Sequence, residues 1–266
     1  MTRRIDERRA VHVEHCMGTV FSIDIRDPGD WSDAIADVVG WLHEADSIFS
    51  TYRIDSDISR LRRGEITVQD AAPVVTEVLD LCVLMQRETD GYFTALWDGA
   101  LDPTGLVKGW AIEQASRMLR RAGSDNHAVN GGGDIQLAGE AAPGAPWRIG
   151  VIDPADRSRV LTVVAGRDFA VATSGRGERG DHILDPFTRR PATALSSVTV
   201  VGRSLTCADS YATAALAMGP AAVGWLKGRP GYEGFVARTD GSVASTPSFP
   251  AAERLVRSSG GHQRVE

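Results

Sequence analysis

The sequence is poor in cysteine and lacks any long hydrophobic run. Its 266 residues include three cysteines, Cys16, Cys82 and Cys207, an odd number without a C-x-x-C pair. This pattern argues against a disulfide framework and favours a reduced, cytoplasmic protein. No run of about eighteen apolar residues occurs, so we expect no membrane insertion. Residues 1–9 carry charges where an export signal needs an apolar core, which also favours a cytoplasmic location.

An excess of basic residues is absent as well. The chain has 29 Lys and Arg against 35 Asp and Glu, which gives a net charge of -6. A nucleic-acid-binding protein usually shows a basic face, so nucleic acid is not expected as a partner. The hydrophobic share of 42% and the charged share of 24% are ordinary for a globular enzyme or binding protein.

Hydrophobic periodicity predicts an α+β fold with mixed sheets and flanking helices, because the elements do not alternate regularly as β-α-β units. Helices are expected over 32–49, 55–61, 73–91, 108–123, 206–219 and 221–227. Strands are expected over 17–25, 134–137, 147–152, 158–165, 168–172, 182–184, 196–201, 233–238 and 242–245. Residues 1–15 are expected to pair poorly, residues 92–107 to be irregular, and the tail after Pro250 to be disordered.

The helix predicted from Thr206 carries two oxygen ligands on one face. Thr206 is the expected N-cap, with Asp209 as its capping-box partner. Asp209 and Thr213 are four residues apart, so both side chains project from the same face near the helix N-terminus. Hard oxygen ligands of this kind suit Mg²⁺. Taken alone, the stretch favours a simpler interpretation, in which Asp209 only caps the helix and Thr213 only packs.

Two glycine-rich stretches could approach a ligand closely. In residues 102–109, Lys108 is expected at a helix N-terminus, where backbone N–H groups and its charge could hold a phosphate. A solvated surface lysine is about equally expected there. Residues 130–134 contain three glycines but continue as a strand, so they are not a dinucleotide-binding fingerprint. Locally, a tight turn between strands explains them best.

A third stretch contains Thr173-Ser174-Gly175 and, a few residues later, His182 and Asp185. Ser174 does not lie in a G-x-S-x-G elbow, so serine-hydrolase chemistry is not expected. Asp185 could orient His182 or raise its basicity, although a lone histidine is more often structural. Tyr52 follows the first predicted helix and is interpreted either as core or as a ring that stacks on a ligand, with core slightly favoured.

Together these stretches resemble the ApbE family, the FAD:protein FMN transferases. The matching motifs, in order along the chain, are Met17-Gly18-Thr19, Phe49-Ser50-x-Tyr52 with Ser59 and Leu61, Gly105-x-x-Lys108-Gly109, Asn130-x-Gly132-Gly133-Asp134, Thr173-Ser174-Gly175, His182-x-x-Asp185-Pro186 and Ala208-Asp209-x-x-x-Thr213. The resemblance covers residues 14–247. It implies one ApbE-like domain over 15–250 with an FAD cleft between two lobes, and tails over 1–14 and 251–266.

The resemblance also implies an activity and a set of site residues. Family members bind FAD, use Mg²⁺ and move the FMN half onto a threonine or serine of an acceptor protein, which releases AMP. By resemblance, Asp209, Thr213 and the backbone carbonyl of Val107 would bind Mg²⁺, and Lys108 would lie near the phosphates. His182 would be the base for the incoming hydroxyl, with Asp185 as its orienter. The residues expected to contact FAD are Met17, Tyr52, Asp134, Thr173, Ser174 and, at the ribose or adenine, Glu113.

Three departures from the family pattern bear on acceptor specificity. Thr94 replaces a usual aspartate, Arg189 replaces a common glycine, and Pro103-Thr104 replace a more usual Leu-Gly. Two other functions use the same residues: hydrolysis of FAD to FMN and AMP, and FAD binding or storage without catalysis. The combination of Lys108, Asp209, Thr213 and His182 favours an enzyme, because storage needs neither a metal pair nor a base.

Overall fold

The computed structural model describes residues 9–97, 99–176 and 183–254. Its helices are α1 (Ser32–Phe49), α2 (Asp57–Arg62), α3 (Pro73–Glu88), α4 (Thr104–Arg121), α5 (Leu205–Met218) and α6 (Ala222–Leu226), with 3₁₀ helices at Val68–Asp70 and Gly219–Ala221. Its strands are β1 (Ala10–Cys16), β2 (Thr19–Ile25), β3 (Leu96–Trp97), β4 (Ala100–Leu101), β5 (His127–Gly131), β6 (Asp134–Ala138), β7 (Trp147–Ile152), β8 (Val160–Gly166), β9 (Ala170–Gly175), β10 (Leu195–Gly202), β11 (Glu233–Arg238), β12 (Val243–Ser245) and β13 (Ala251–Arg254).

An eight-stranded sheet organises the molecule. Its strand order is β1-β2-β5-β6-β9-β10-β11-β12, and every neighbouring pair in it is antiparallel. A smaller antiparallel sheet has the order β13-β8-β7, and β3 pairs with β4 alone. The predicted α+β class is therefore confirmed, with sheets that are antiparallel throughout the described residues.

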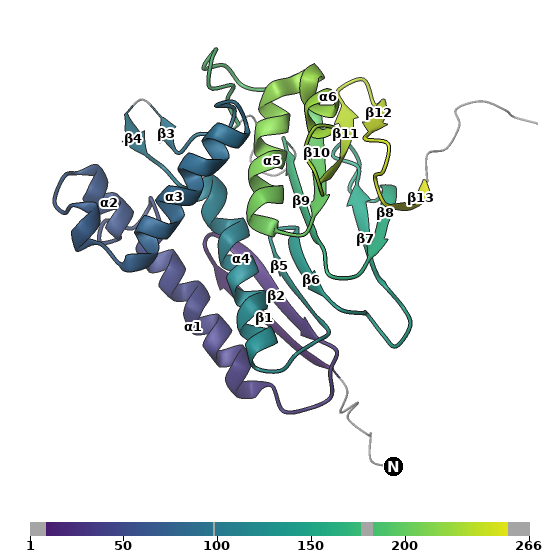
Figure 1. The fold of residues 1–266 in the computed structure, drawn as a ribbon, viewed down its shortest axis with the longest axis horizontal. Coiled ribbons are helices and arrows are strands. Elements are labelled where there is room, and N and C mark those ends of the chain that lie inside the picture. Colours follow the sequence, from purple (N-terminus) through teal and green to yellow (C-terminus); the bar gives the residue numbers. More distant parts are fainter. Residues whose placement is uncertain (1–8, 98, 177–182, 255–266) are drawn as a thin grey trace, which may run out of the picture.

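The large sheet has a hydrophobic core on each face. Successive side chains of a strand point to opposite faces, so Val198 and Val200 of β10 join the helices while Val201 joins the small sheet. Helices α1, α4 and α5 lie against one face, and the small sheet lies against part of the other (Figure 1). The result is a three-layered molecule in which α4 and α5 lie side by side on the sheet.

Several predicted elements are confirmed. The helix expected over 32–49 is α1 with the same bounds, and its side chains at Val38, Leu42 and Ala45 are buried. The amphipathic spacing that includes Val38 and Leu42 is what the prediction used. The strand expected over 147–152 is β7, and the expected C-terminal hairpin is β11 with β12.

The expectation that residues 1–15 pair poorly is wrong for residues 10–15. They form most of β1, which pairs with β2 along its whole length. β1 is the edge strand of the sheet, and alternation along it turns every second side chain to solvent, so Val11 and Val13 are more than half exposed at 54% and 55%. The polar composition of this segment reflects exposure rather than a lack of pairing, and the folded domain extends to Ala10.

The helix expected from Lys108 begins earlier, at Thr104. Residues 92–107, expected to be irregular, contain the β3–β4 pair and the first turn of α4. The carboxylate of Asp102 accepts hydrogen bonds from the backbone N–H of Thr104 at 3.1 Å and from its hydroxyl at 2.6 Å. Pro103 then precedes the helix, a place where its missing N–H costs little. Proline and glycine here mark a helix start rather than an irregular segment.

Two C-terminal expectations also change. The tail expected to be disordered after Pro250 continues as β13, which pairs with β8. The strand expected over 182–184 is reduced to an isolated bridge between Leu184 and Pro191 in the part of it that the structure describes.

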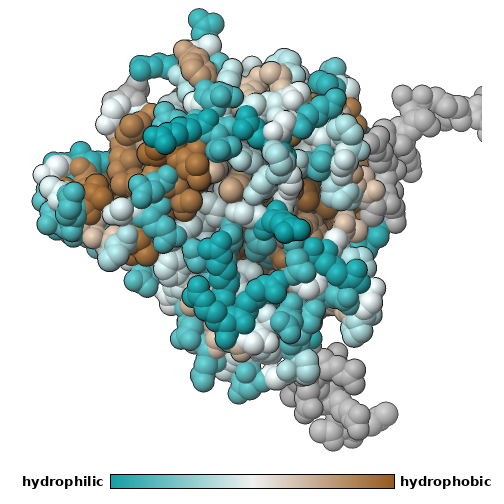
Figure 2. Space-filling model, viewed as in Figure 1, coloured by the Kyte–Doolittle hydropathy of each residue, from teal (hydrophilic) through white to brown (hydrophobic). Residues whose placement is uncertain are grey.

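Hydrophobic side chains also reach the surface. On the face shown in Figure 2, hydrophobic residues gather over α3, where Val83 and Leu84 are about half exposed at 47% and 46%. None of the helices in the described ranges is long and apolar enough to cross a membrane.

Candidate functional site

One lysine and two aspartates from three distant segments meet between the helices and the large sheet. Lys108 comes from α4, Asp134 from the first position of β6, and Asp209 from α5. The Lys108 ammonium pairs with Oδ2 of Asp134 and lies 3.2 Å from Oδ2 of Asp209. The side chains of the two aspartates are only 2% and 8% exposed, and that of the lysine is 26% exposed. These residues form a buried charged cluster with one partly open side.

Gly109 lets α4 and α5 approach closely enough to form this cluster. A Cβ atom placed on Gly109 would lie 2.9 Å from both the Cβ of Asp209 and the backbone oxygen of Leu205. Real Cβ atoms essentially never come this near to another heavy atom, so only glycine fits without a shift of one helix. In this Lys-Gly dipeptide, Lys108 therefore supplies the charge of the cluster, and Gly109 leaves the space that α5 occupies.

A tight turn fixes the position of Asp134. Gly132 and Gly133 connect β5 to β6 with positive φ angles of 60° and 93°, a conformation suited to glycine. The interpretation of residues 130–134 as a turn between strands is thus confirmed. Oδ1 of Asp134 accepts a hydrogen bond from the backbone N–H of Thr173 at 2.9 Å, so the neighbouring strand β9 holds this carboxylate too.

Ser174 and Thr213 extend the cluster, whereas the Thr173 side chain does not. The hydroxyls of Ser174 and Thr213 lie 3.1 Å apart, which links β9 to α5 one turn beyond Asp209. Alternation along β9 turns the Thr173 side chain to the opposite sheet face, where its hydroxyl lies 2.9 Å from that of Thr199. Of the Thr173–Ser174 pair, only the second side chain faces the charged cluster.

Met17 lies in a second turn beside the first. Met17 and Gly18 connect β1 to β2 with φ angles of 50° and 67°. A Cβ atom on Gly132 would lie 2.9 Å from the hydroxyl of Thr19, so the two turns touch. A methionine with positive φ is uncommon, since the conformation crowds its Cβ. The first and fourth family motifs are therefore neighbours in space.

Glu113 joins α4 to the start of α5. Its Oε2 accepts hydrogen bonds from the Ser204 hydroxyl at 2.7 Å, the Thr206 backbone N–H at 3.0 Å and the Thr206 hydroxyl at 2.7 Å. Its Oε1 accepts one from Arg117. Glu113 is 8% exposed, and its carboxylate caps the positive end of α5. Its four donors all come from the protein itself.

The cap of α5 differs from the predicted one. Ser204 is the N-cap, and its hydroxyl accepts from the backbone N–H of Cys207 at 3.3 Å. Thr206, the expected N-cap, lies inside the first turn. Asp209, its expected capping-box partner, pairs with Lys108 instead. The Thr206-x-x-Asp209 spacing gave the wrong register because Glu113, far away in sequence, supplies the acid.

Val107 and Tyr52 lie in contrasting environments. Val107 is buried in the first turns of α4, and its carbonyl therefore points along the helix axis. Tyr52 is 98% exposed, so the interpretation of Tyr52 as a core residue is wrong. Tyr52 follows α1 in a bend, where a short polar segment leaves its ring in solvent.

Asp185 builds its own turn. Its Oδ1 accepts from the backbone N–H of Phe187 at 2.9 Å, and its Oδ2 accepts from the Thr188 hydroxyl at 2.9 Å. His182, the expected base, lies outside the described residues, so the predicted pairing of His182 with Asp185 stays a prediction. The two departures Thr94 and Arg189 line one pocket of about 260 Å³ next to this turn.

The oxygen ligands that Asp209 and Thr213 offer fit a Mg²⁺ ion. Among the described residues, no group of three or more His, Cys, Asp or Glu side chains could hold a metal. Mg²⁺ needs no such group, because it often binds through one or two carboxylates, waters and the phosphates of a substrate. Asp209 and the Thr213 hydroxyl offer hard oxygens on one helix face, and the nearby ammonium already marks the place as one that favours positive charge.

Sequence reasoning missed Ser204 and Gln136, which position α5. The Gln136 side chain accepts from the backbone N–H of Leu205 at 3.1 Å and donates to the carbonyl of Arg203 at 3.3 Å. Asp134 and Gln136 are two apart in a strand, so their spacing already places them on one face. That signal was available in the sequence. The contact of Ser204 with Glu113 had no local signal.

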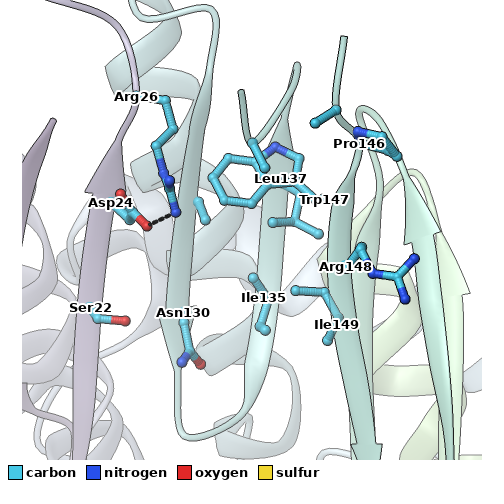
Figure 3. A pocket seen from close by; sticks show the side chains of 13 residues that line it. Ser22, Asp24, Arg26, Asn130, Ile135, Leu137, Pro146, Trp147, Arg148 and Ile149 are labelled. Atoms are coloured by element: carbon cyan, nitrogen blue, oxygen red, sulfur yellow. Dashed lines mark hydrogen bonds and ion pairs between the residues drawn. The ribbon is translucent and has the colours of Figure 1, made fainter. Parts of the chain in front are cut away.

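A pocket on the other face of the large sheet lies away from this cluster. It has a volume of about 510 Å³ and is lined by parts of β2, β5, β6 and β7 (Figure 3). Ile135 and Leu137 of β6 line it, and they point to the sheet face opposite to Asp134 and Gln136. None of the predicted site residues lines this pocket, so its size does not make it the candidate site.

Comparisons with known proteins connect the cluster to a family. The model of the ApbE family matches residues 17–99 and 96–236. The chain is 28% identical over 265 residues to the FAD:protein FMN transferase of Vibrio cholerae, covering 76% of this chain and 79% of that protein. It is 27% identical over 191 residues to the protein of the same name from Escherichia coli K12, covering 68% of this chain and 54% of that protein.

Solved structures share the fold. The flavin transferase ApbE from Vibrio cholerae aligns with a TM-score of 0.77 and 24% identity, covering 91% of this chain and 98% of that chain. The apo form of Pseudomonas stutzeri flavinyl transferase ApbE aligns with a TM-score of 0.81 and 22% identity, covering 95% and 100%. Because the family model spans well over half of the sequence, the chain belongs to the ApbE family.

Proposed function

We propose that this protein is a Mg²⁺-dependent enzyme that transfers the FMN half of FAD to a threonine or serine of an acceptor protein and releases AMP. The observation that carries the proposal is the buried meeting of Lys108, Asp134 and Asp209, which come from three separate family motifs. Relatives 27% and 28% identical to this chain are named FAD:protein FMN transferases, which supports the same activity here.

The chemistry exchanges the phosphoanhydride bond between the FMN and AMP halves of FAD for a phosphoester bond to the acceptor. The acceptor hydroxyl attacks the phosphorus of the FMN half, a new O–P bond forms, and the P–O bond to the leaving AMP breaks. The hydroxyl proton passes to a base, for which His182 is our candidate with Asp185 as its orienter. Catalysis of this kind depends mainly on positioning and on positive charge near the anhydride.

This chain offers two sources of that charge. The Lys108 ammonium stands at the partly open side of the cluster and can meet a phosphate. Asp209 and Thr213, with the Val107 carbonyl as third ligand, would hold Mg²⁺, which supplies charge neutralisation at the pyrophosphate when bound. Asp134 pairs with the Lys108 ammonium and so positions it for a contact with the phosphates.

The proposed contacts with the flavin and adenine come from residues around the charged cluster. Ser174 adjoins the cluster through Thr213, and Met17 lies in the turn beside the glycine turn that precedes Asp134. The exposed Tyr52 ring is free to stack on an aromatic ligand.

The Glu113 carboxylate already accepts hydrogen bonds from four protein donors. We therefore propose that its main role is to cap α5 and that a contact with the ribose is secondary. An FAD cleft between two lobes and a role of Thr173 in it remain part of the proposal.

We also propose a cytoplasmic location. The three cysteines are free in the structure, two of them buried, as suits a reducing compartment. Cell fractionation tests this, and recovery of the protein only from an oxidising compartment would contradict it.

Intact-mass spectrometry tests the activity. The protein is mixed with FAD, Mg²⁺ and a panel of candidate acceptor flavoprotein domains, with EDTA in the control. An acceptor that gains the mass of FMN, with release of AMP, is the expected result. Free FMN without an adduct would show hydrolysis instead. Bound FAD without either product would reduce the protein to a binding role and contradict the proposal.

A further inference from the structure

The Lys108 ammonium is the counter-ion of two carboxylates at once. It pairs with Oδ2 of Asp134 and lies 3.2 Å from Oδ2 of Asp209. Within the described ranges, no other cationic side chain forms an ion pair with either aspartate. Two carboxylates and one ammonium leave the cluster with a net charge of about -1, which a buried site tolerates poorly.

The two carboxylates hold the lysine differently. Asp134 is 2% exposed, follows a fixed glycine turn and is bound on its other oxygen by the Thr173 backbone N–H at 2.9 Å. Asp209 meets the ammonium through Oδ2, and no described residue donates a hydrogen bond to its Oδ1. Asp134 is therefore a fixed anchor for the ammonium, whereas Asp209 keeps an oxygen for another cation.

A divalent ion and an ammonium at the Asp209 carboxylate disfavour each other, even though they can use different oxygens. A metal on Oδ1 and the ammonium on Oδ2 would lie a few ångströms apart, and like charges at that separation repel strongly in a poorly solvated site. An ammonium also has three donors, of which the two aspartates take two. A lysine that leaves Asp209 but stays on Asp134 gains a second free donor, which can meet the oxygen of a phosphate.

We propose that Lys108 is a displaceable counter-ion: it neutralises Asp209 while no metal is bound, and a divalent cation at Asp209 and Thr213 shifts it to Asp134 and to the phosphate of the ligand. The displacement of the lysine by a metal is argued from the charged cluster alone. The assignment of the phosphate to FAD rests on the proposed function. Metal and phosphate then favour each other's binding, because each stabilises the same position of the lysine.

The test measures metal binding without FAD or acceptor. Mn²⁺ is the probe, and free Mn²⁺ is followed by electron paramagnetic resonance, with Mg²⁺ as competitor. Lys108→Gln removes the competing charge, so it should bind Mn²⁺ at least about tenfold more tightly than the wild type. Lys108→Arg keeps the charge and should stay within about threefold of the wild type. Equal or weaker binding by Lys108→Gln would overturn the proposal.

A second pair of variants covers the case in which Lys108→Gln does not fold. Lys108→Gln combined with Asp134→Asn removes one charge of each sign and keeps the cluster at about -1. We expect this double variant to bind Mn²⁺ at least about tenfold more tightly than Asp134→Asn alone, which still has the competing ammonium. Equal affinities of the two would contradict displacement.

A phosphate probe tests the coupling. In the wild type, a saturating concentration of ADP should tighten Mn²⁺ binding at least about fivefold, and in Lys108→Gln this gain should fall below about twofold. An unchanged gain in the variant would show that the lysine does not carry the coupling. Loss of FMN transfer with these binding results intact would count against the proposed function and leave the counter-ion role standing.

Discussion

At the scale of single residues, the charged cluster depends on a glycine as well as on its charged groups. Lys108 and Asp209 can pair only because Gly109 allows α5 to lie against α4. The glycine has no reactive group, and its effect is entirely steric. A side chain there would force the Lys108 and Asp209 backbones apart before it touched any ligand.

Gly109→Ala is therefore expected to destabilise the fold. The new Cβ would lie 2.9 Å from two atoms of α5, and relief of such overpacking typically costs about 1–3 kcal/mol. Urea-induced unfolding at neutral pH measures this loss as a lower free energy of unfolding. The matched control is Gly40→Ala in α1, where a Cβ meets no heavy atom within 4 Å.

Gly40→Ala should raise the free energy of unfolding by about 0.5–1 kcal/mol, because alanine loses less backbone freedom on folding. If the two substitutions changed stability by the same amount and sign, the close approach of α4 and α5 at Gly109 would be wrong.

At the scale of elements, α4 makes buried polar contacts with both α5 and the large sheet. Glu113 caps α5, and Ser116 one turn later contacts His127 at the start of β5. His127 is fully buried; its Nε2 lies 2.8 Å from the Ser116 hydroxyl and its Nδ1 lies 2.9 Å from the Ser124 hydroxyl. The helix is thus fixed to α5 on one side and to the sheet on the other by buried polar contacts.

The buried histidine predicts a pH dependence of stability. Burial, with a further contribution from Arg120, lowers the pKa of His127 from 6.5 to about 4. The unfolded chain therefore binds a proton between these pH values that the folded protein does not. The stabilisation is complete above about pH 6.5 and is lost as the pH falls to about 4, which amounts to about 3 kcal/mol.

Unfolding free energies of the wild type and of His127→Gln between pH 7 and pH 4 measure this effect. The glutamine keeps a donor and an acceptor but does not titrate, so its stability should fall less steeply over the same range. Parallel curves for the two proteins would show that His127 is not the group that responds.

At the scale of the whole molecule, local patterns predicted elements better than they predicted their partners. Periodicity gave α1 and β7 with the bounds of the structure, because an amphipathic stripe or an alternating strand is a property of neighbouring residues. The same reasoning failed for β1, whose exposure on an edge imitates the composition of an unpaired segment.

The charged cluster shows the limit of sequence reasoning more sharply. Each of Lys108, Asp134 and Asp209 was a weak candidate by itself, and their order along the chain indicated the family. Nothing in the local sequence could predict that one ammonium bridges the two aspartates or that Glu113, rather than Asp209, is the acidic partner at the start of α5. Both are long-range contacts, set by how closely α4, α5 and the sheet pack.

The most direct test of the account is the Mg²⁺-dependent formation of an FMN–acceptor adduct by the wild type and by Asp209→Ala, followed by intact mass. Loss of the carboxylate should lower the initial rate at least ~100-fold at saturating Mg²⁺, since a bound metal supplies several kcal/mol of charge stabilisation. His182→Ala should also be slower, by ~10²–10⁴-fold, yet still bind FAD measurably. Adduct formation by Asp209→Ala at the wild-type rate would contradict the central claim that this cluster binds the metal and transfers FMN.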